Sequence, residues 1–502
     1  MSELYETVST LKQLKESGWK SLSVKEELRK NLIAKIGKGE ELFPGILGYD
    51  TTVSPQIQHA IISKHDMILL GLRGQAKTKI LRSLSNFLDE YIPVVKGSEI
   101  NDDPLNPISK FAKKVIEENG GDTEISWLHR SFRYGEKLAT PDTTVADLIG
   151  DIDPIKAATK KLDLADENVI NYGLIPRTNR GIFVINELPD LQPRIQVALL
   201  NIMQERDIQI RGFNIRMPID IAMAFSANPE DYTNRGNIIT PLKDRIDSQI
   251  ITHYPREIET GIQITKQEAW QQRDKKIKVS IADVYRNIIE QTAFEARDSE
   301  YIDQKSGVST RMTITALEQV ISSAERRAVI NKETAANVRI ADIFHMIPAL
   351  TGKLELVYEG EQEGAISVAK HIIGKAINKT FKKTFPDPQS KAENVKEMYK
   401  PITDWFANGN EINLPDIIPS KDYKEELKKV SGLEELVKKH VNDAQKDELF
   451  VWMDLVLEAM YQNSLLSKQD LDDQALYTDM LGSMFSSIGG MGDEDDFEDF
   501  DI

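Results

Sequence analysis

The sequence contains no cysteine among its 502 residues. Disulfide bonds and thiolate metal sites are therefore excluded, which suits the reducing conditions of a cytoplasm. The seven histidines are scattered, and none has partners at the spacing that metal ligands require. No apolar run approaches the length of a membrane span, and the first residues lack the basic and apolar regions of a signal peptide. We therefore expect a cytoplasmic protein without a membrane span.

Basic residues are fewer than acidic ones: the chain has 63 Lys and Arg residues and 80 Asp and Glu residues, which gives a net charge of −17. This balance argues mildly against nucleic acid as the main partner, although the net charge is compatible with a basic channel elsewhere on the molecule. Part of the acidity is local to the last ten residues, which contain Asp493, Glu494, Asp495, Asp496, Glu498, Asp499 and Asp501. We expect residues 481–502 to be a disordered, solvated acidic tail, with a docking role as the alternative.

The chain is long enough for several domains, and its 40% hydrophobic and 28% charged content is typical of a globular protein. Between residues 41 and 256, apolar runs of the β type alternate with helical stretches such as Pro193–Gln204. This alternation predicts an α/β domain with a parallel sheet flanked by helices. The runs are Met67–Leu70, Ile182–Ile185, Asp207–Arg211, Asn214–Met217, Ile219–Ser226 and Ile250–His253.

Helical patterns dominate on either side of this domain. Residues 1–40 are expected to be a helical segment, in which Ser23 and Glu26 match a capping box. Residues 257–355 are expected to form a small all-α domain, with helices at Ile258–Glu268, Ile281–Ala296, Thr315–Ile330 and Lys332–Ile347. Residues 356–480 are expected to be a further helical region of unassigned role. Its apolar stripe, which predicts core or an interaction face, consists of Leu449, Trp452, Met453, Val456 and Met460. Residues 97–123 are predicted to be an insertion or long loop.

A glycine-rich turn directly follows the first apolar run. It consists of Gly71, Leu72, Arg73, Gly74, Gln75, Ala76, Lys77 and Thr78. In such a turn, successive backbone N–H groups point at the β- and γ-phosphates of a nucleotide, the lysine adds a point charge and the threonine hydroxyl can hold Mg²⁺. The turn therefore predicts a site for ATP and Mg²⁺.

Ala76 departs from the usual phosphate-loop pattern, in which a second glycine precedes the lysine. Its methyl group adds little clash if its φ angle is negative. Taken alone, the turn is also compatible with an ordinary strand–turn–helix connection, so the rest of the chain must decide.

Two polar residues end the apolar strand that begins at Gly181. Glu187 is placed to polarise the water that attacks the nucleotide. Asn186 stands where NTPases of this kind carry an acid that orients the Mg²⁺ shell; its amide can accept a hydrogen bond from a metal-bound water but brings no charge. The alternative is that Glu187 only caps the helix that begins near Pro189.

Three residues further along the chain fit the same chemistry. Asn228 ends another apolar strand and could position the water or sense the γ-phosphate, although Asn-Pro is also a simple turn signal. Arg245 is placed to act as an arginine finger on a neighbouring subunit's γ-phosphate, or else pairs with a surface carboxylate. Arg311 opens a helix of the all-α domain and could reach nucleotide from that side.

This order of elements resembles that of the AAA+ ATPases, in particular the branch that contains MoxR-type ATPases and the ATPase (I-type) subunit of magnesium chelatase. MoxR-type members often carry alanine before the lysine. Further segments that carry the resemblance are Ala146–Asp153, Tyr172–Ile175, Asn179–Phe183, Leu199–Ile208 and Pro241–Asp247. The resemblance covers about residues 43–353, and Asn186 departs from the Asp that is usual there.

The resemblance implies an AAA+ P-loop core at 41–256 with an all-α lid at 257–355, and ATP bound between them. By it, Lys77 and the loop backbone hold the phosphates, and Thr78 and Asn186 order Mg²⁺. Glu187 activates water, Asn228 positions it, Arg245 acts in trans and Arg311 acts from the lid. A finger from a neighbouring subunit requires a ring, which we expect to be a hexamer.

Three functions stay open on the sequence. The favoured one is a MoxR-like chaperone that couples ATP hydrolysis to remodelling of a protein partner, which in this family usually has a von Willebrand factor A domain. The second is the ATPase subunit of a magnesium chelatase, which drives Mg²⁺ insertion into protoporphyrin. The third is a nucleotide-binding module with little hydrolysis, which the neutral Asn186 makes credible.

Overall fold

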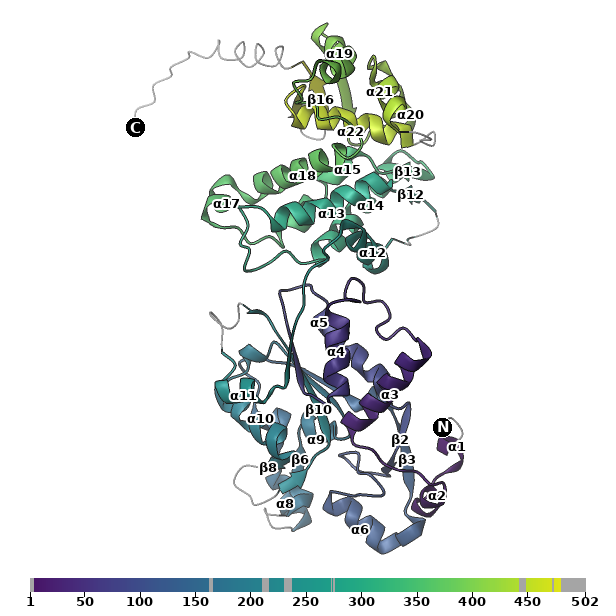
Figure 1. The fold of residues 1–502 in the computed structure, drawn as a ribbon, viewed down its shortest axis with the longest axis vertical. Coiled ribbons are helices and arrows are strands. Elements are labelled where there is room, and N and C mark those ends of the chain that lie inside the picture. Colours follow the sequence, from purple (N-terminus) through teal and green to yellow (C-terminus); the bar gives the residue numbers. More distant parts are fainter. Residues whose placement is uncertain are drawn as a thin grey trace, which may run out of the picture. The chain divides into compact units, whose positions relative to one another are not determined.

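The computed structural model divides the chain into two compact units, Met1–Tyr254 and Pro255–Ile502 (Figure 1). It describes residues 4–161, 166–209, 216–229, 237–271, 273, 276–441, 448–471 and 474–479. The acidic tail predicted at 481–502 lies outside these residues, as do parts of the two strands predicted between Asp207 and Met217.

The first unit contains a parallel sheet of five strands, which confirms the predicted α/β fold. In spatial order the strands are β11 (Ser248–Ile251), β1 (Met67–Leu70), β10 (Ile221–Ala227), β7 (Gly181–Asn186) and β4 (Tyr134–Leu138). Every residue of β7 and β10 is buried, as expected for strands covered on both faces. Strand β4 is the member that the sequence analysis missed.

Two apolar clusters cover the two faces of the sheet, because neighbouring residues of a strand point to opposite sides. In β7, Ile182 and Val184 belong to one cluster, whereas Phe183 and Ile185 belong to the other. The first face is covered by α3 (Val24–Lys38), α4 (Val53–Ile62) and α5 (Lys77–Ser83), and the second by α10 (Pro193–Glu205) and α11 (Thr240–Arg245) (Figure 1).

The N-terminal segment consists of helices, in line with the expectation, whereas the predicted insertion has more structure than expected. Helices α1 (Leu4–Thr7) and α2 (Leu11–Glu16) precede α3, and the capping box of α3 is present, with Ser23 N donating to Glu26 Oε2 at 3.3 Å. The prediction of an insertion or long loop at 97–123 is wrong in part, because this segment contains α6 (Lys110–Asn119). Buried Asp102 orders the turn before α6 by accepting hydrogen bonds from the backbone N–H groups that lead into it.

Short antiparallel ribbons lie outside the main sheet of the first unit. They pair β2 (Tyr91–Val95) with β3 (Ile125–His129), β5 (Gly150–Ile152) with β6 (Ile170–Tyr172), and β8 (Asp207–Gln209) with β9 (Arg216–Pro218). The remaining helices of this unit are α7 (Val145–Leu148), α8 (Pro154–Lys160) and α9 (Leu174–Arg177).

The second unit is mainly helical. Its helices are α12 (Ile258–Glu268), α13 (Asp283–Arg297), α14 (Arg311–Ile330), α15 (Ile340–Phe344), α16 (Ile347–Thr351), α17 (Tyr358–Glu363), α18 (Ala365–Phe381), α19 (Glu393–Ala407), α20 (Ser420–Lys429), α21 (Leu433–His440) and α22 (Glu448–Gln462). The single helix predicted at Lys332–Ile347 is wrong, because β13 (Ala335–Asn337) pairs there with β12 (Lys278–Ser280) before α15 begins. A small sheet of β14 (Ile412–Pro415), β16 (Gln474–Thr478) and β15 (Ser467–Leu471) was also not predicted.

One apolar core runs through the second unit from Ala269 to Tyr477, so the boundary expected at residues 355/356 lies within it. The stripe on α22 belongs to this core, with Met453, Val456 and Met460 fully buried. Among the described residues, no helix combines the length and apolar character needed to cross a membrane.

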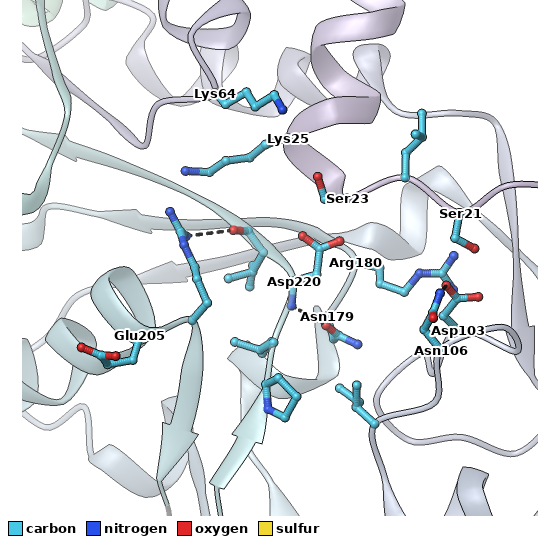
Figure 2. A pocket seen from close by; sticks show the side chains of 16 residues that line it. Ser21, Ser23, Lys25, Lys64, Asp103, Asn106, Asn179, Arg180, Glu205 and Asp220 are labelled. Carbon is cyan, nitrogen blue, oxygen red and sulfur yellow. Dashed lines mark hydrogen bonds between the residues drawn. The ribbon is translucent and has the colours of Figure 1, made fainter.

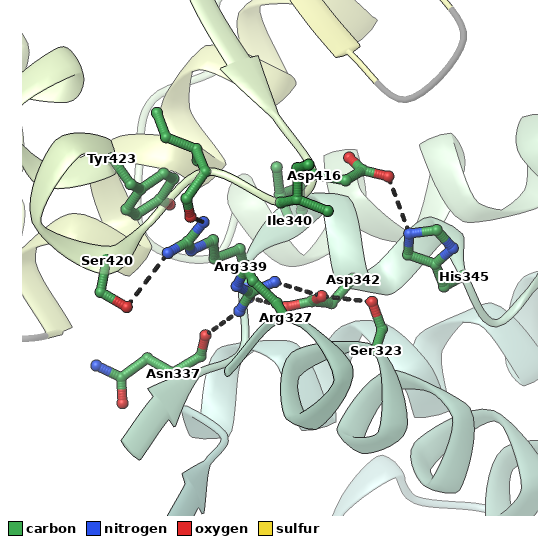
Figure 3. Close-up of polar contacts among 12 residues, drawn as sticks. Ser323, Arg327, Asn337, Arg339, Ile340, Asp342, His345, Asp416, Ser420 and Tyr423 are labelled. Atoms are coloured by element: carbon green, nitrogen blue, oxygen red, sulfur yellow. Dashed lines mark hydrogen bonds and ion pairs between the residues drawn. The ribbon is translucent and has the colours of Figure 1, made fainter. Parts of the chain in front are cut away.

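Polar contacts add to this core where α14 and α15 meet the segment before α20 (Figure 3). Arg327 and Asp342 form an ion pair of 2.6 Å with both side chains buried. Arg339 donates to the Ile418 carbonyl at 2.8 Å, and its guanidinium lies 4.0 Å from the ring centroid of Tyr423. The helices expected to form a lid and those that follow them are thus joined into one structural unit.

Candidate nucleotide site

The predicted phosphate loop lies at the carboxyl edge of the parallel sheet, between β1 and α5. Strand β10 lies beside β1 and β7 lies beside β10, all three parallel, so residues that follow these strands meet at the same edge. Open α/β sheets bind their ligands at this edge. The structure therefore brings together Lys77, Asn228 and Glu187, which lie far apart in the sequence.

These three side chains form a continuous chain of hydrogen bonds. Lys77 Nζ donates to Asn228 Oδ1 at 2.7 Å, and Asn228 Nδ2 donates to Glu187 Oε2 at 3.1 Å. Lys77 is buried, and its ammonium also donates to the carbonyls of Gly71 and, at 3.0 Å, Leu72. The lysine ammonium thus bonds to the backbone of its own loop, the segment at which the resemblance expects phosphate.

The backbone of the loop uses left-handed conformations at two positions. Gly74 has φ 75°, which glycine adopts without strain, and Ala76 has φ 56°. The condition under which Ala76 would be harmless, a negative φ, is therefore not met. A non-glycine residue in this region costs about 1–2 kcal/mol, so the loop holds Ala76 in a strained conformation.

Side chains outside the motif hold the loop in place through hydrogen bonds to its carbonyl groups and to Gln75, and the sequence analysis did not predict them. Tyr254 donates to the Arg73 carbonyl at 2.8 Å, and the Tyr49 hydroxyl lies 3.0 Å from the Gln75 carbonyl. Burial raises the pKa of Tyr49 to about 12, which keeps its hydroxyl a neutral donor. Thr252 Oγ1 donates to Gln75 Oε1 at 2.6 Å. No local pattern marks these residues, because each contact is made across the fold.

Gly71 is required by this packing. A Cβ atom there would lie 2.0 Å from Thr252 Oγ1 and 2.1 Å from Gln75 Oε1. The glycine that begins the motif therefore allows Thr252, the residue after β11, to approach the loop closely.

Asn186 is held between two strands by both ends of its amide. Its Nδ2 donates to Glu136 Oε1 at 2.8 Å, and its Oδ1 accepts from Ser226 Oγ at 2.9 Å. The predicted bond from a metal-bound water to Asn186 therefore has only the second lone pair of Oδ1 available. Glu136 also accepts from Arg82, and neither was singled out from the sequence.

The two predicted arginines lie elsewhere. Arg245 ends α11, where its guanidinium donates to Gln204 Oε1 at 2.9 Å and to the Pro241 carbonyl at 2.8 Å. It does not contact the phosphate loop of its own chain. Arg311 belongs to the second unit, where it is exposed and begins α14. The roles of both arginines stay predictions.

A magnesium ion at this site would rely on few protein ligands. Within the described parts of the chain, no group of three or more His, Asp or Glu side chains could hold a metal ion. Mg²⁺ is commonly bound by one or two protein oxygens together with nucleotide phosphates and water. The predicted Thr78 hydroxyl, on the first turn of α5, fits that pattern.

A cavity of about 590 Å³ lies at the opposite, amino edge of the sheet (Figure 2). Its walls carry both charge signs, and Lys25 and Arg206 both pair with buried Asp66 at 2.8 Å. Burial raises the pKa of Asp220, whose carboxylate accepts a hydrogen bond from Val24 N. Because Lys25 and Arg206 are already paired with Asp66, we do not assign a phosphate site to this cavity.

Comparison with known proteins finds two curated relatives, both named magnesium-chelatase 38 kDa subunit. The Cereibacter sphaeroides protein is 26% identical over 213 residues, which are 41% of this chain and 56% of the relative. The Rhodobacter capsulatus protein is 25% identical over 238 residues, which are 43% of this chain and 60% of the relative. The matches thus span less than two thirds of either relative.

Solved structures resemble the chain more distantly. A chain from a complex between subunits BchI and BchD of magnesium chelatase is 19% identical, covers 64% of this chain and 98% of its own length, and has a TM-score of 0.34. No family model matches the chain. The chain is thus similar in sequence, over less than half of its length, to two proteins named magnesium-chelatase 38 kDa subunit.

Proposed function

We propose that this chain binds ATP with Mg²⁺ and hydrolyses it, as a ring-forming AAA+ ATPase that acts on a protein partner. The observation that carries the proposal is the chain of hydrogen bonds from Lys77 through Asn228 to Glu187. It links the phosphate loop to a carboxylate at the edge of the sheet where nucleotides bind. A surface ion pair or a helix cap would not require this arrangement.

Each residue has a defined task in this proposal. Lys77 and the loop backbone hold the β- and γ-phosphates, and the Thr78 hydroxyl takes part in holding Mg²⁺. The ion, when bound, neutralises charge on the phosphate oxygens. Glu187 accepts a proton from the attacking water, and Asn228 holds the Glu187 carboxylate in position through its amide. Positioning and electrostatic stabilisation supply most of the catalysis in phosphoryl transfer.

We propose that Arg245 acts as an arginine finger on the γ-phosphate of the nucleotide in a neighbouring subunit. Among the described residues its guanidinium bonds only to neutral oxygens, so no carboxylate of those residues compensates its charge. It is half-buried on α11, and a subunit that packs there would place a phosphate within its reach. Arg311 would act on the nucleotide from the second unit. A hexamer, a chaperone role of the MoxR kind and a partner with a von Willebrand factor A domain belong to the same proposal.

Two other functions have an observation in their favour. The named relatives favour the ATPase subunit of a magnesium chelatase. Addition of the chain to a chelatase assay that lacks its 38 kDa subunit would decide this, because only a chelatase subunit restores Mg²⁺ insertion into the porphyrin. The neutral Asn186 favours a nucleotide-binding module with little hydrolysis.

Steady-state ATP hydrolysis and nucleotide binding test the main proposal together. Glu187→Gln should retain binding and lower turnover about 10²- to 10⁴-fold, the usual contribution of a general base. Lys77→Ala should lose binding, whereas Glu117→Gln on α6, which makes the same chemical change at an exposed position, should behave as wild type. Nucleotide binding with equal, negligible turnover in wild type and Glu187→Gln would leave the binding module as the function.

A further inference from the structure

The carboxylate absent from position 186 is present on the neighbouring strand. Glu136 lies on β4, which pairs with β7 so that Leu138 faces Asn186 and Glu136 faces Val184. Glu136 and Asn186 are therefore diagonal neighbours, a separation that a long side chain can bridge. The 2.8 Å bond between Asn186 Nδ2 and Glu136 Oε1 shows that it does.

The hydrogen bonds fix which way the Asn186 amide faces. A carboxylate only accepts hydrogen bonds, so the amide nitrogen must face Glu136. The amide oxygen then faces Ser226, whose hydroxyl donates to it at 2.9 Å. Asn186 is uncharged, yet it holds a charged group in place at the carboxyl edge of the sheet.

Arg82 links the same carboxylate to α5, the helix that carries the predicted magnesium ligand Thr78. Its Nε lies 2.8 Å from Glu136 Oε2 and its Nη2 lies 3.0 Å from Oε1. Arg82 follows Thr78 by four residues in α5, so both lie on one face of the helix, about 6 Å apart along its axis. The Glu136 carboxylate is therefore bound by a residue from the helix face that also carries Thr78.

One partner of this carboxylate is easily replaced. Glu136 accepts from Asn186, from Tyr134 at 3.2 Å and twice from Arg82, which together use its usual lone-pair positions. The Arg82 side chain is 64% exposed, whereas that of Glu136 is 22% exposed. Because most of the Arg82 side chain is already in solvent, water can take its place on the carboxylate.

We propose that Glu136 supplies the negative charge of the magnesium site in place of the residue at 186, and that Arg82 occupies it until the ion binds. In the bound state the carboxylate accepts a hydrogen bond from a water in the Mg²⁺ shell, and Arg82 turns into solvent. This inference rests on the proposed nucleotide site and adds the residue that gives it its preference for a divalent cation.

The test measures how strongly Mg²⁺ enhances binding of a fluorescent ATP analogue to the full-length protein. Glu136→Gln should weaken the apparent Mg²⁺ affinity about 10- to 100-fold, the usual effect of losing a partner in the outer shell of a metal. Binding measured in EDTA should stay within about twofold of wild type, because Glu136 does not contact the phosphates in this proposal. Arg82→Gln should not weaken the Mg²⁺ affinity, since it removes the competing cation.

A charge swap gives the matched control. In the double variant Glu136→Gln/Asn186→Asp the carboxylate moves to position 186 and the amide to 136, so the hydrogen bond between the strands is kept. Ser226 can still donate to the new carboxylate. We expect the swap to restore the Mg²⁺ affinity to within about threefold of wild type, and it decides the matter if Glu136→Gln alone fails to fold.

The proposal is overturned by any of three results. They are a wild-type Mg²⁺ affinity in Glu136→Gln, an equal loss in Arg82→Gln, and failure of the folded swap variant to recover the affinity. Absence of nucleotide binding in the wild type, with and without Mg²⁺, would instead refute the proposed function itself.

Discussion

A buried ion pair holds the N-terminal helix α3 within the first unit, and its removal should be costly. Arg133 Nη1 lies 2.7 Å from Glu27 Oε1, and Nη2 lies 2.6 Å from Oε2. The two side chains are only 1% and 5% exposed. Arg133 Nε also donates to the Arg180 carbonyl at 2.8 Å, which leaves the guanidinium no route to water. Its charge is therefore compensated by Glu27.

We expect Glu27→Met, which keeps the volume and removes the charge, to lower the free energy of unfolding of the first unit by about 3–5 kcal/mol. For a unit of 254 residues this corresponds to a fall in melting temperature of roughly 6–20 °C. The double variant Glu27→Met/Arg133→Met should regain most of the loss, because replacing both charges by apolar groups is often nearly neutral. It should not regain all of it, since the Asp89 N–H loses its acceptor on Glu27.

Differential scanning calorimetry of the full-length protein measures this effect, and peptide-level hydrogen exchange assigns the affected transition to one unit. Glu40→Gln is the control, since it breaks an exposed ion pair between Glu40, which follows α3, and Lys35 on α3. This variant should have the melting temperature of the wild type. If Glu27→Met melts with the control, or if the double variant is no more stable than the single, the pair does not carry the stability that its burial indicates.

Two further predictions follow from single positions. Ala76→Gly should raise the melting temperature of the ligand-free protein in thermal unfolding by about 1–3 °C. The reason is that relief of about 1–2 kcal/mol of backbone strain exceeds the cost of roughly 0.4–1 kcal/mol from the larger conformational entropy of the unfolded chain. A lower melting temperature would show that the backbone at position 76 is not left-handed. Burial raises the pKa of Asp454 to about 6, so its carboxyl group holds a proton more tightly in the folded protein than in the unfolded chain. The contribution of this carboxyl group to the free energy of unfolding is therefore greatest below about pH 4 and is lost as pH rises through about 6. Urea unfolding of the second unit at pH 5 and pH 7 measures this, and Asp454→Asn should reduce the difference between the two; an unchanged difference would contradict it.

The residues at the carboxyl edge of the sheet illustrate what a sequence can reveal about a site. The phosphate loop and the polar ends of β7 and β10 were predicted because each is a local pattern: an apolar run followed by a turn or a polar side chain. Their meeting point followed from the parallel sheet, in which carboxyl ends share one edge. The pairing of Asn228 with both Lys77 and Glu187 agrees with that reasoning.

Contacts between residues that are distant in the sequence could not be predicted from local patterns. Strand β4 carries Gly135, Glu136 and Lys137 in place of an alternating apolar run, so it was not recognised, and with it Glu136 was missed. The helix predicted at Lys332–Ile347 failed for a similar reason, because the pairing of β13 with β12 overrides the local helical pattern.

The sequence by itself determined the α/β fold, the place of the phosphate loop and the residues that follow its neighbouring strands. These features depend on backbone periodicity and turn chemistry, which are encoded within a few residues. The tertiary structure alone decided the φ angle of Ala76, the orientation of the Asn186 amide and the position of the Glu136 carboxylate beside it. Such features depend on side chains from strands and helices that are distant in the chain, and only packing brings them within hydrogen-bond distance.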